Sequence, residues 1–177
     1  MRPADVHVRD ASLDDAVACA AIYAPYVVDS VASFEEAPPD ALEISKRMSH
    51  AWCWLVAELD NQVVGYAYGS RHRERPAYRW AADVTVYLHA SIHRRGIGRA
   101  LYQQLIPRLR EMGFRTLCAG ITEPNPASIG LHRSIGFEIV GTYQRIGWKA
   151  DAWHDVTWMQ LQLRNDPGTP REPVTVR

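Results

Sequence analysis

The arrangement that most limits the possible folds is an apolar strand that runs into a basic loop and then into a helix that starts with glycines. Val84, Val86 and Leu88 alternate with other residues over 81–89, which predicts a strand. The loop that follows contains His93, Arg94, Arg95, Gly96, Ile97, Gly98 and Arg99. Glycines let a backbone approach a phosphate closely, and the N–H groups and dipole at a helix start favour an anion. This segment therefore predicts a pyrophosphate site.

The glycine pair does not belong to the best-known nucleotide motifs. The P-loop pattern GxxxxGK followed by Ser or Thr is absent, and Leu101 stands where the third glycine of a dinucleotide fingerprint would be. A Gly-x-Gly pair also serves simply to ease a turn. From this pair alone, both interpretations stay open.

The remaining sequence alternates between helix and strand periods and predicts one mixed α/β sheet with about seven strands and four helices. Ser12 and Asp15 have the spacing of a capping box, and their helix is expected to end before Pro25. Asp60-Asn61 between two apolar runs predicts a β-hairpin. The other expected elements are a strand at 6–8, helices at 40–50, 98–112 and 125–136, and strands at 115–121, 137–146 and 154–163.

These elements predict a single domain over 1–164 and a polar, proline-containing tail over 165–177, disordered or bound to a partner. The chain has 177 residues, with 20 Lys+Arg against 20 Asp+Glu, and this balance argues against a nucleic-acid partner. Three scattered cysteines without a CxxC pair predict reduced thiols and a cytoplasmic location. The first residues lack the apolar core of a signal peptide, and the longest apolar run is interrupted by Pro25 and too short to span a membrane.

A second motif makes the basic loop specific. About 25 residues after it come Asn125-Pro126-Ala127-Ser128-Ile129-Gly130-Leu131-His132 and then Gly136-Phe137. Together the two motifs resemble the coenzyme A site of the GNAT acetyltransferase superfamily. Within it, the chain is similar to the phosphinothricin and methionine sulfoximine N-acetyltransferases over about residues 6–163. The stretches that carry this likeness include Trp54-Leu55-Val56-Ala57-Glu58, Gly65-Tyr66-Ala67-Tyr68, Ala77-Tyr78-Arg79-Trp80 and Trp153-His154-Asp155-Val156.

The resemblance implies the GNAT fold and acetyl-CoA as co-substrate. It places the backbone of Val86, Tyr87 and Leu88 against the pantetheine arm, and the loop His93 to Arg99 around the pyrophosphate. It also places Asn125 and Ser128 beside the pantetheine. His93 occupies a position where Gln or Arg is usual. Because backbone amides do most of the binding, we expect this difference to weaken pyrophosphate binding little.

The resemblance also assigns two catalytic positions. Asp83 stands where the subfamily usually has a Glu that acts as general base, and because Asp is shorter we expect a relayed water. A purely structural carboxylate is the alternative. His132 stands where many members of the superfamily carry a Tyr that protonates the leaving thiolate. It either orients Asp83 or serves as this acid, and the alternative is a hydrogen-bonded core histidine.

The segment 69–80 is a local basic patch that the neutral net charge of the chain hides. It contains four arginines and one histidine against a single acidic residue, Glu74. Arginine forks suit carboxylate, phosphinate or sulfoximine oxygens, although a solvated charge run is the ordinary interpretation of such a cluster. By this resemblance, the acceptor pocket is expected to be lined by Phe34, Arg73, Arg75, Tyr78, Val84 and Thr85. His72 replaces the Trp that is usual in the subfamily.

We therefore predict an acetyl-CoA-dependent N-acetyltransferase that acts by direct attack on the α-amine of a small anionic amino-acid analogue such as phosphinothricin, methionine sulfoximine or methionine sulfone. The alternatives are acetylation of a protein N-terminus or another amine, and a catalytically weak acetyl-CoA-binding regulatory module. No metal is expected, since the HExxH motif is absent. His89 and His93 are four residues apart, but they span the end of a strand and a loop. The aromatic stripe Trp148, Trp153 and Trp158 indicates core packing or the homodimer that relatives form.

Overall fold

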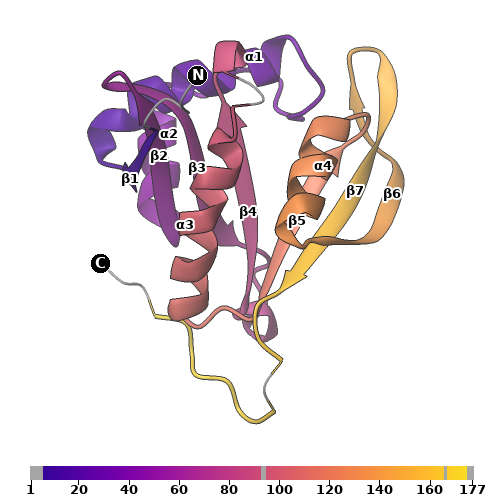
Figure 1. Ribbon diagram of the computed structural model, residues 1–177. Coiled ribbons are helices and arrows are strands. Elements are labelled where there is room, and N and C mark those ends of the chain that lie inside the picture. The colour runs from indigo at the N-terminus through magenta and orange to yellow at the C-terminus, as the bar shows by residue number, and fades with distance from the viewer. Residues whose placement is uncertain (1–5, 93–94, 166, 175–177) are drawn as a thin grey trace.

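The structure is a computed structural model that describes residues 6–92, 95–165 and 167–174. Its centre is a seven-stranded sheet in the order β1-β2-β3-β4-β5-β7-β6, in which β4 and β5 are parallel and the other described pairs are antiparallel (Figure 1). The strands are β1 (His7–Asp10), β2 (Cys53–Leu59), β3 (Gln62–Arg71), β4 (Ala81–Leu88), β5 (Thr116–Thr122), β6 (Glu138–Lys149) and β7 (Ala152–Gln162). The helices are α1 (Ala16–Val28), α2 (Ala41–His50), α3 (Ile97–Glu111) and α4 (Pro126–Ile135), with the short turns η1 (Leu13–Asp15), η2 (Pro76–Tyr78) and η3 (Ala90–Ile92).

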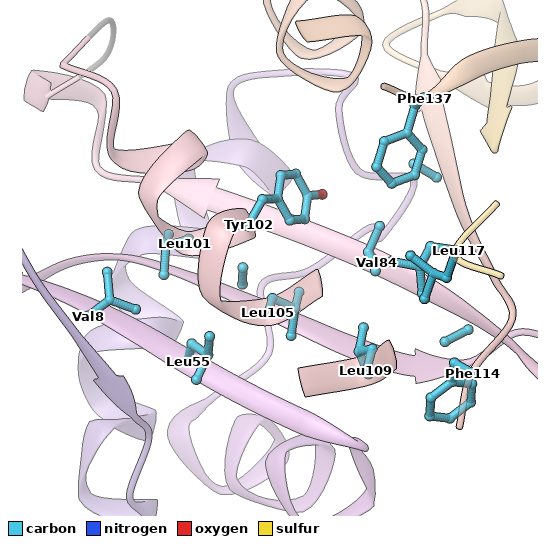
Figure 2. Packing of buried hydrophobic residues seen from close by; sticks show 14 of the residues in the cluster. Val8, Leu55, Val84, Leu101, Tyr102, Leu105, Leu109, Phe114, Leu117 and Phe137 are labelled. Atoms are coloured by element: carbon cyan, nitrogen blue, oxygen red, sulfur yellow. The ribbon is translucent and has the colours of Figure 1, made fainter. Parts of the chain in front are cut away.

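The helices cover both faces of the sheet because the strands alternate apolar side chains on both sides. On β2, Trp54 and Val56 pack with α1 and α2, whereas Leu55 and Ala57 pack on the other face with α3. Figure 2 shows the leucines of α3 over the sheet, in one buried cluster with Leu55 and Val84. The predicted mixed sheet and its four helices are confirmed.

Local signals set several element ends as predicted. Asp60 and Asn61 have φ values of 52° and 61°, the left-handed pair that a two-residue hairpin needs, and they join β2 to β3. Asp40 caps α2 by accepting a hydrogen bond from the Glu43 amide at 2.8 Å. The predicted hairpin is confirmed.

The prediction that the first helix ends before Pro25 is wrong. Helix α1 continues to Val28, and the amide of Asp29 still donates to the carbonyl of Pro25 at 2.8 Å. Val27 is buried against the sheet, and the Tyr26 hydroxyl donates to the Leu88 carbonyl at 2.6 Å. Packing of the last turn therefore outweighs the hydrogen bond that proline removes.

The expectation of a disordered or partner-bound tail is corrected for 171–174. The indole N–H of Trp80 donates to the Arg171 carbonyl at 2.8 Å, and the Val174 amide donates to the Met112 carbonyl at 2.9 Å. Glu172 pairs with Arg79. This part of the tail therefore packs against the C-terminal end of α3 and the η2 segment (Figure 1).

Across the described ranges of the chain, none of the helices combines the length and the apolar character that a membrane span requires.

The start of the first helical segment offers a test of pH-dependent stability. The Asp15 carboxylate accepts two hydrogen bonds from Arg9, at 2.7 and 2.8 Å, and one from the Ser12 amide at 2.7 Å. The Arg9 hydrogen bonds hold the pKa of Asp15 below its ordinary value of 3.8, so the charged form stabilises the fold above about pH 4, and this stability is lost as pH falls through the depressed pKa.

We expect Asp15→Asn to lower the free energy of unfolding by about 1.5–3 kcal/mol at pH 7, since hydrogen bonds to a charged group are lost. The difference from the unmodified protein should shrink below about pH 4. Urea titrations at pH 7 and pH 3 measure both effects. Asp14→Asn changes the neighbouring, exposed carboxylate and should have little effect. Equal losses at the two pH values would contradict the assignment.

Candidate active site

The site lies where two parallel strands part. Strands β4 and β5 pair only over Ala81–Asp83 and Thr116–Cys118, although β4 continues to Leu88 and β5 to Thr122. Figure 1 shows the two strands diverging beyond this pairing. Beyond Asp83, none of the described strands pairs with β4 on its β5 side. Apart from the Leu88 carbonyl, which accepts from the Tyr26 hydroxyl, the backbone N–H and C=O groups on that side are available to a ligand.

Asp83 lies at the last paired position and contacts a histidine. Its Oδ1 lies 2.6 Å from His72 Nδ1, and because an ionised carboxylate only accepts, Nδ1 donates. The two side chains are only 26% and 15% exposed. Burial raises the pKa of Asp83 above its ordinary value, while the His72 hydrogen bond and the charges of His72 and Arg73 act in the opposite direction. The carboxylate is thus poised as a stronger base than an exposed Asp.

The prediction that His132 orients Asp83 is corrected, because the hydrogen-bond partner of Asp83 is His72. His132 is buried in α4, and its Nδ1 donates to the Ser128 carbonyl at 2.8 Å. Its Nε2 is then left to accept from the Tyr102 hydroxyl at 3.0 Å. Burial lowers the pKa of His132, which keeps the ring neutral. These contacts favour the core-histidine interpretation.

The helix start after the basic loop has the geometry that an anion needs. Gly96 precedes α3 with φ of 77° and provides no side-chain cap, so the first amides of the helix are left for a ligand. A side chain at Gly98 would bring its Cβ within 3.0 Å of Leu131, so this glycine lets α3 approach α4 closely. Arg95 is exposed, whereas Arg99 donates to the Ser134 carbonyl at 3.3 Å. His93 and Arg94 lie outside the described residues.

The second predicted coenzyme motif forms a helix cap beside this loop. The Asn125 side chain accepts from the Ser128 amide at 3.1 Å, and Pro126 occupies the first helical position of α4. The open backbone of β4, the uncapped start of α3 and this capped start of α4 are the features that a pantetheine and a pyrophosphate require. The residues therefore fit acetyl-CoA.

Three predicted acceptor residues gather around Asp83. The Arg73 guanidinium lies 5.7 Å from the centre of the Trp158 ring and donates to the His72 carbonyl at 3.0 Å. The rings of Tyr78 and His72 lie 5.8 Å apart, edge to face. Thr85 is on the same face of β4 as Asp83, two residues further along.

Two of the other loop arginines are held in ion pairs elsewhere. Arg71 pairs with Glu74, and Arg79 pairs with Glu172. Arg75 is exposed at the start of η2 and has no ion pair within the described part of the chain. Arg73 is therefore the arginine that the structure brings to Asp83.

The prediction that Val84 lines the acceptor pocket is corrected. Its side chain is 5% exposed and lies in the core cluster with Leu105 of α3 and Leu117 of β5, on the face of β4 opposite Asp83 (Figure 2). Strand alternation explains this, because neighbouring residues on a strand point to opposite faces.

Phe34 lies in the segment between α1 and α2. It lies against the hairpin of β6 and β7, where a Cβ at Gly147 would be only 2.2 Å from its ring. Lys149 of the same hairpin donates to the carbonyls of Val27 and Ser33 at 2.6 and 2.7 Å. The α1–α2 segment and the β6–β7 hairpin are therefore held together, with Phe34 between them.

Three residues of this region were not predicted from the sequence as site residues. Cys118 is the register partner of Asp83 across the parallel pair, a pairing that no sequence pattern announced. Lys149 donates to backbone carbonyls, and no sequence pattern indicated this role either. Trp158 belonged to the predicted aromatic stripe, and its place under Arg73 could have been suspected from that cation.

A separate hollow lies elsewhere in the fold. A pocket of about 750 Å³ is lined by Asp10, Met48, Trp52 and Arg108, near the end of β1 and the C-terminal ends of α2 and α3, and contains none of the predicted site residues. The site is defined instead by the parted strands and the convergent polar groups.

A sheet that opens between two parallel strands beside an uncapped helix start, with a carboxylate at the opening, defines an acyl-CoA-dependent N-acyltransferase. The sequence model described as "Acetyltransferase (GNAT) family" matches residues 18–137. The chain belongs to this family of acetyltransferases, and acetyl-CoA is its co-substrate. The implied fold and enzyme class are confirmed.

Individual relatives cover nearly the whole chain. The phosphinothricin N-acetyltransferase of Streptomyces viridochromogenes is 33% identical over 174 residues, which are 96% of this chain and 95% of that protein. The L-methionine sulfoximine/L-methionine sulfone acetyltransferase of Pseudomonas aeruginosa is 35% identical over 161 residues, 88% of this chain and 94% of that protein. The structure of a phosphinothricin acetyltransferase from Sinorhizobium meliloti in complex with AcCoA has a TM-score of 0.86 and 37% identity, and covers 89% of this chain and 88% of that one.

Proposed function

We propose that this enzyme transfers the acetyl group of acetyl-CoA to the α-amine of a small anionic amino-acid analogue of the phosphinothricin or methionine sulfoximine type. The observation that carries the proposal is that the half-buried Asp83 carboxylate and the Arg73 guanidinium lie near one another at one opening of the sheet. The first group suits the acceptor's ammonium, and the second suits its acidic group. The relatives named for such acceptors support this choice.

In the proposed mechanism, Asp83 removes the proton that keeps the acceptor amine unreactive. The raised pKa of this carboxylate brings its basicity closer to neutrality, and the proton moves to Oδ directly or through a water. His72 donates to the carboxylate and holds its orientation, so it is a positioning residue. Bound acetyl-CoA supplies the thioester that the neutral amine attacks, forming an amide and releasing the thiol.

The remaining residues position the reactants. The start of α3 at Gly96 and the open edge of β4 hold the coenzyme, and Arg73 holds the acceptor's anionic end. Holding amine and thioester in line supplies much of the acceleration in such reactions. His132 supports α4 beside the coenzyme through Ser128 and Tyr102, in contact with neither Asp83 nor His72 among the described hydrogen bonds.

A panel of acceptors tests the proposal. Release of free thiol from acetyl-CoA is measured with phosphinothricin, methionine sulfoximine, methionine sulfone, peptides with a free N-terminus, and polyamines. We expect the highest kcat/KM with the anionic amino-acid analogues. Faster turnover of peptides or polyamines would replace the proposed acceptor, and tight acetyl-CoA binding without turnover on any amine would favour the regulatory module.

Phe34 is the apolar wall of the proposed acceptor pocket, and Gly147 allows a test of its position. An alanine at 147 places its Cβ where the Phe34 ring lies, so the ring must leave its preferred rotamer. We expect Gly147→Ala to raise the KM for the acceptor about 2- to 10-fold, the equivalent of that rotamer cost, with the KM for acetyl-CoA unchanged.

The matched control is Gly141→Ala on the same strand, where an added Cβ meets no atom within 4 Å. Its acceptor KM should stay at the unmodified value. If Gly141→Ala and Gly147→Ala behave alike, Phe34 is not part of the acceptor pocket.

A cytoplasmic location and a homodimer complete the proposal. Three free cysteines support a reducing compartment. Large apolar side chains exposed on β6 and β7 support a contact with a second copy; they are Ile139, Val140, Tyr143, Ile146, Trp148 and Trp153.

A further inference from the structure

We propose that His72, Asp83 and Cys118 form a binding site for Zn²⁺ and that Zn²⁺ bound there inhibits acetyl transfer. One imidazole nitrogen, one carboxylate oxygen and one thiol sulfur lie within 4.8 Å of one another. The binding does not depend on the proposed function, whereas the inhibition rests on Asp83 being the base in that function.

Neighbouring backbones hold the three side chains on one face of the sheet. Asp83 on β4 and Cys118 on β5 are register partners. Asp83 also pairs with Ser70 of β3, and His72 follows two residues later, so it returns to the same face. Ligands placed on or beside paired strands need little ordering when an ion binds. Because the three residues are far apart in the sequence, local spacing predicted no metal site.

The distances suit a tetrahedral ion after small side-chain movements. Zn–S bonds of about 2.3 Å and Zn–N or Zn–O bonds of about 2.0–2.1 Å place tetrahedral ligands roughly 3.3–3.6 Å apart. The His72 and Asp83 atoms are now 2.6 Å apart, and the largest separation in the set is at most 4.8 Å. Shifts of about 1 Å therefore convert the hydrogen-bonded cluster into three-ligand coordination, with the fourth position open.

The ligand chemistry and the charge favour Zn²⁺ over Mg²⁺ or Ca²⁺. Thiolate and imidazole select borderline and soft ions, whereas the hard ions take oxygen ligands. The Cys118 thiol gives up its proton to the solvent as the S–Zn bond forms. One carboxylate and one thiolate then balance the two positive charges of the ion. Arg73, the cation beside this cluster, consequently meets no additional net charge.

Zn²⁺ at this site blocks catalysis through Asp83. A carboxylate oxygen that is coordinated to the ion is not available to take a proton from the acceptor ammonium. To bind the ion through Nδ1, His72 gives up the Nδ1 proton and carries its proton on Nε2 instead, exchanged through the solvent, so the hydrogen bond that orients the base is also lost.

Cobalt spectroscopy tests the binding. The full chain is titrated with Co²⁺ and then with Zn²⁺, and we expect a thiolate-to-cobalt charge-transfer band with tetrahedral d–d bands, all removed by Zn²⁺. Cys118→Ser should abolish the charge-transfer band and weaken Zn²⁺ binding at least about tenfold, the smallest loss typical of groups that merely support a metal ligand. Cys53→Ser changes another half-buried cysteine, which lies on β2 and outside the three-residue cluster, and should keep the band. A band that is absent, or unchanged in Cys118→Ser, would overturn the site.

Activity measurements separate this inference from the proposed function. The acetylated product is followed by chromatography, because thiol reagents interact with Zn²⁺. We expect Zn²⁺ to lower the kcat of the unmodified enzyme, a chelator to restore it, and Cys118→Ser to keep its metal-free rate in the presence of Zn²⁺. Binding without inhibition would refute the inhibition and the role of Asp83 as base. Absence of binding in an enzyme that still requires Asp83 would refute this inference alone.

Discussion

Replacing Asp83 with Asn is expected to lower kcat by about 10²–10⁴, the range that a positioned general base supplies. Asparagine has nearly the same shape and still accepts the His72 hydrogen bond, so the loss reports the missing basicity. The KM for acetyl-CoA should stay unchanged, because Asp83 faces the acceptor side of β4. Steady-state kinetics with both substrates varied measures these constants.

A pH series distinguishes a base from a structural carboxylate. As pH rises, the acceptor ammonium loses its proton to the solvent without help from a base. The loss of kcat in Asp83→Asn should therefore shrink towards alkaline pH. Asp83→Glu retains a carboxylate and should keep at least tenfold more activity than Asp83→Asn, about the smallest difference that a working base would leave. A kcat within about threefold of the unmodified enzyme in Asp83→Asn, at all pH values, would show that the carboxylate is structural.

Elements that local chemistry determines could be predicted from the sequence. The hairpin at Asp60-Asn61 needs only two residues that tolerate positive φ, and the start of α4 needs only the Asn125-Pro126 pair. Helix α1 continues through Pro25 because Val27 is buried against the sheet and Tyr26 hydrogen-bonds to it. These contacts depend on the folded sheet, so the local sequence around Pro25 does not predict them.

Some residues of the candidate site could be predicted and others could not, because several contacts there depend on how the strands pair. The position of Asp83 came from the resemblance, but its contact with His72 depends on how β3 ends beside β4, and Cys118 depends on a parallel register. Strand alternation alone could have excluded Val84, because it separates Val84 from Asp83 and Thr85. Residues that act together across strands become visible only when the pairing is known.

Replacing Arg73 with Ala is expected to raise the KM for an anionic acceptor about 10- to 100-fold. This is the effect of losing charge-assisted hydrogen bonds worth about 1.5–3 kcal/mol in free energy of binding. Arg73 is the loop arginine that the structure holds near Asp83, between the His72 carbonyl and the Trp158 ring. A planar fork held there can bind the acceptor's acidic group while its amine faces the base.

The acceptor itself provides the decisive comparison for Arg73. The unmodified enzyme should prefer methionine sulfoximine over its carboxamide, which lacks the carboxylate charge, and Arg73→Ala should lose most of this preference, because the guanidinium that recognises this charge is gone. Arg71→Ala removes another exposed arginine, which pairs with Glu74, and should leave both KM values unchanged. If Arg71→Ala and Arg73→Ala raise KM equally, the loop attracts anions only through its summed charge, and high salt would then remove the effect in both variants.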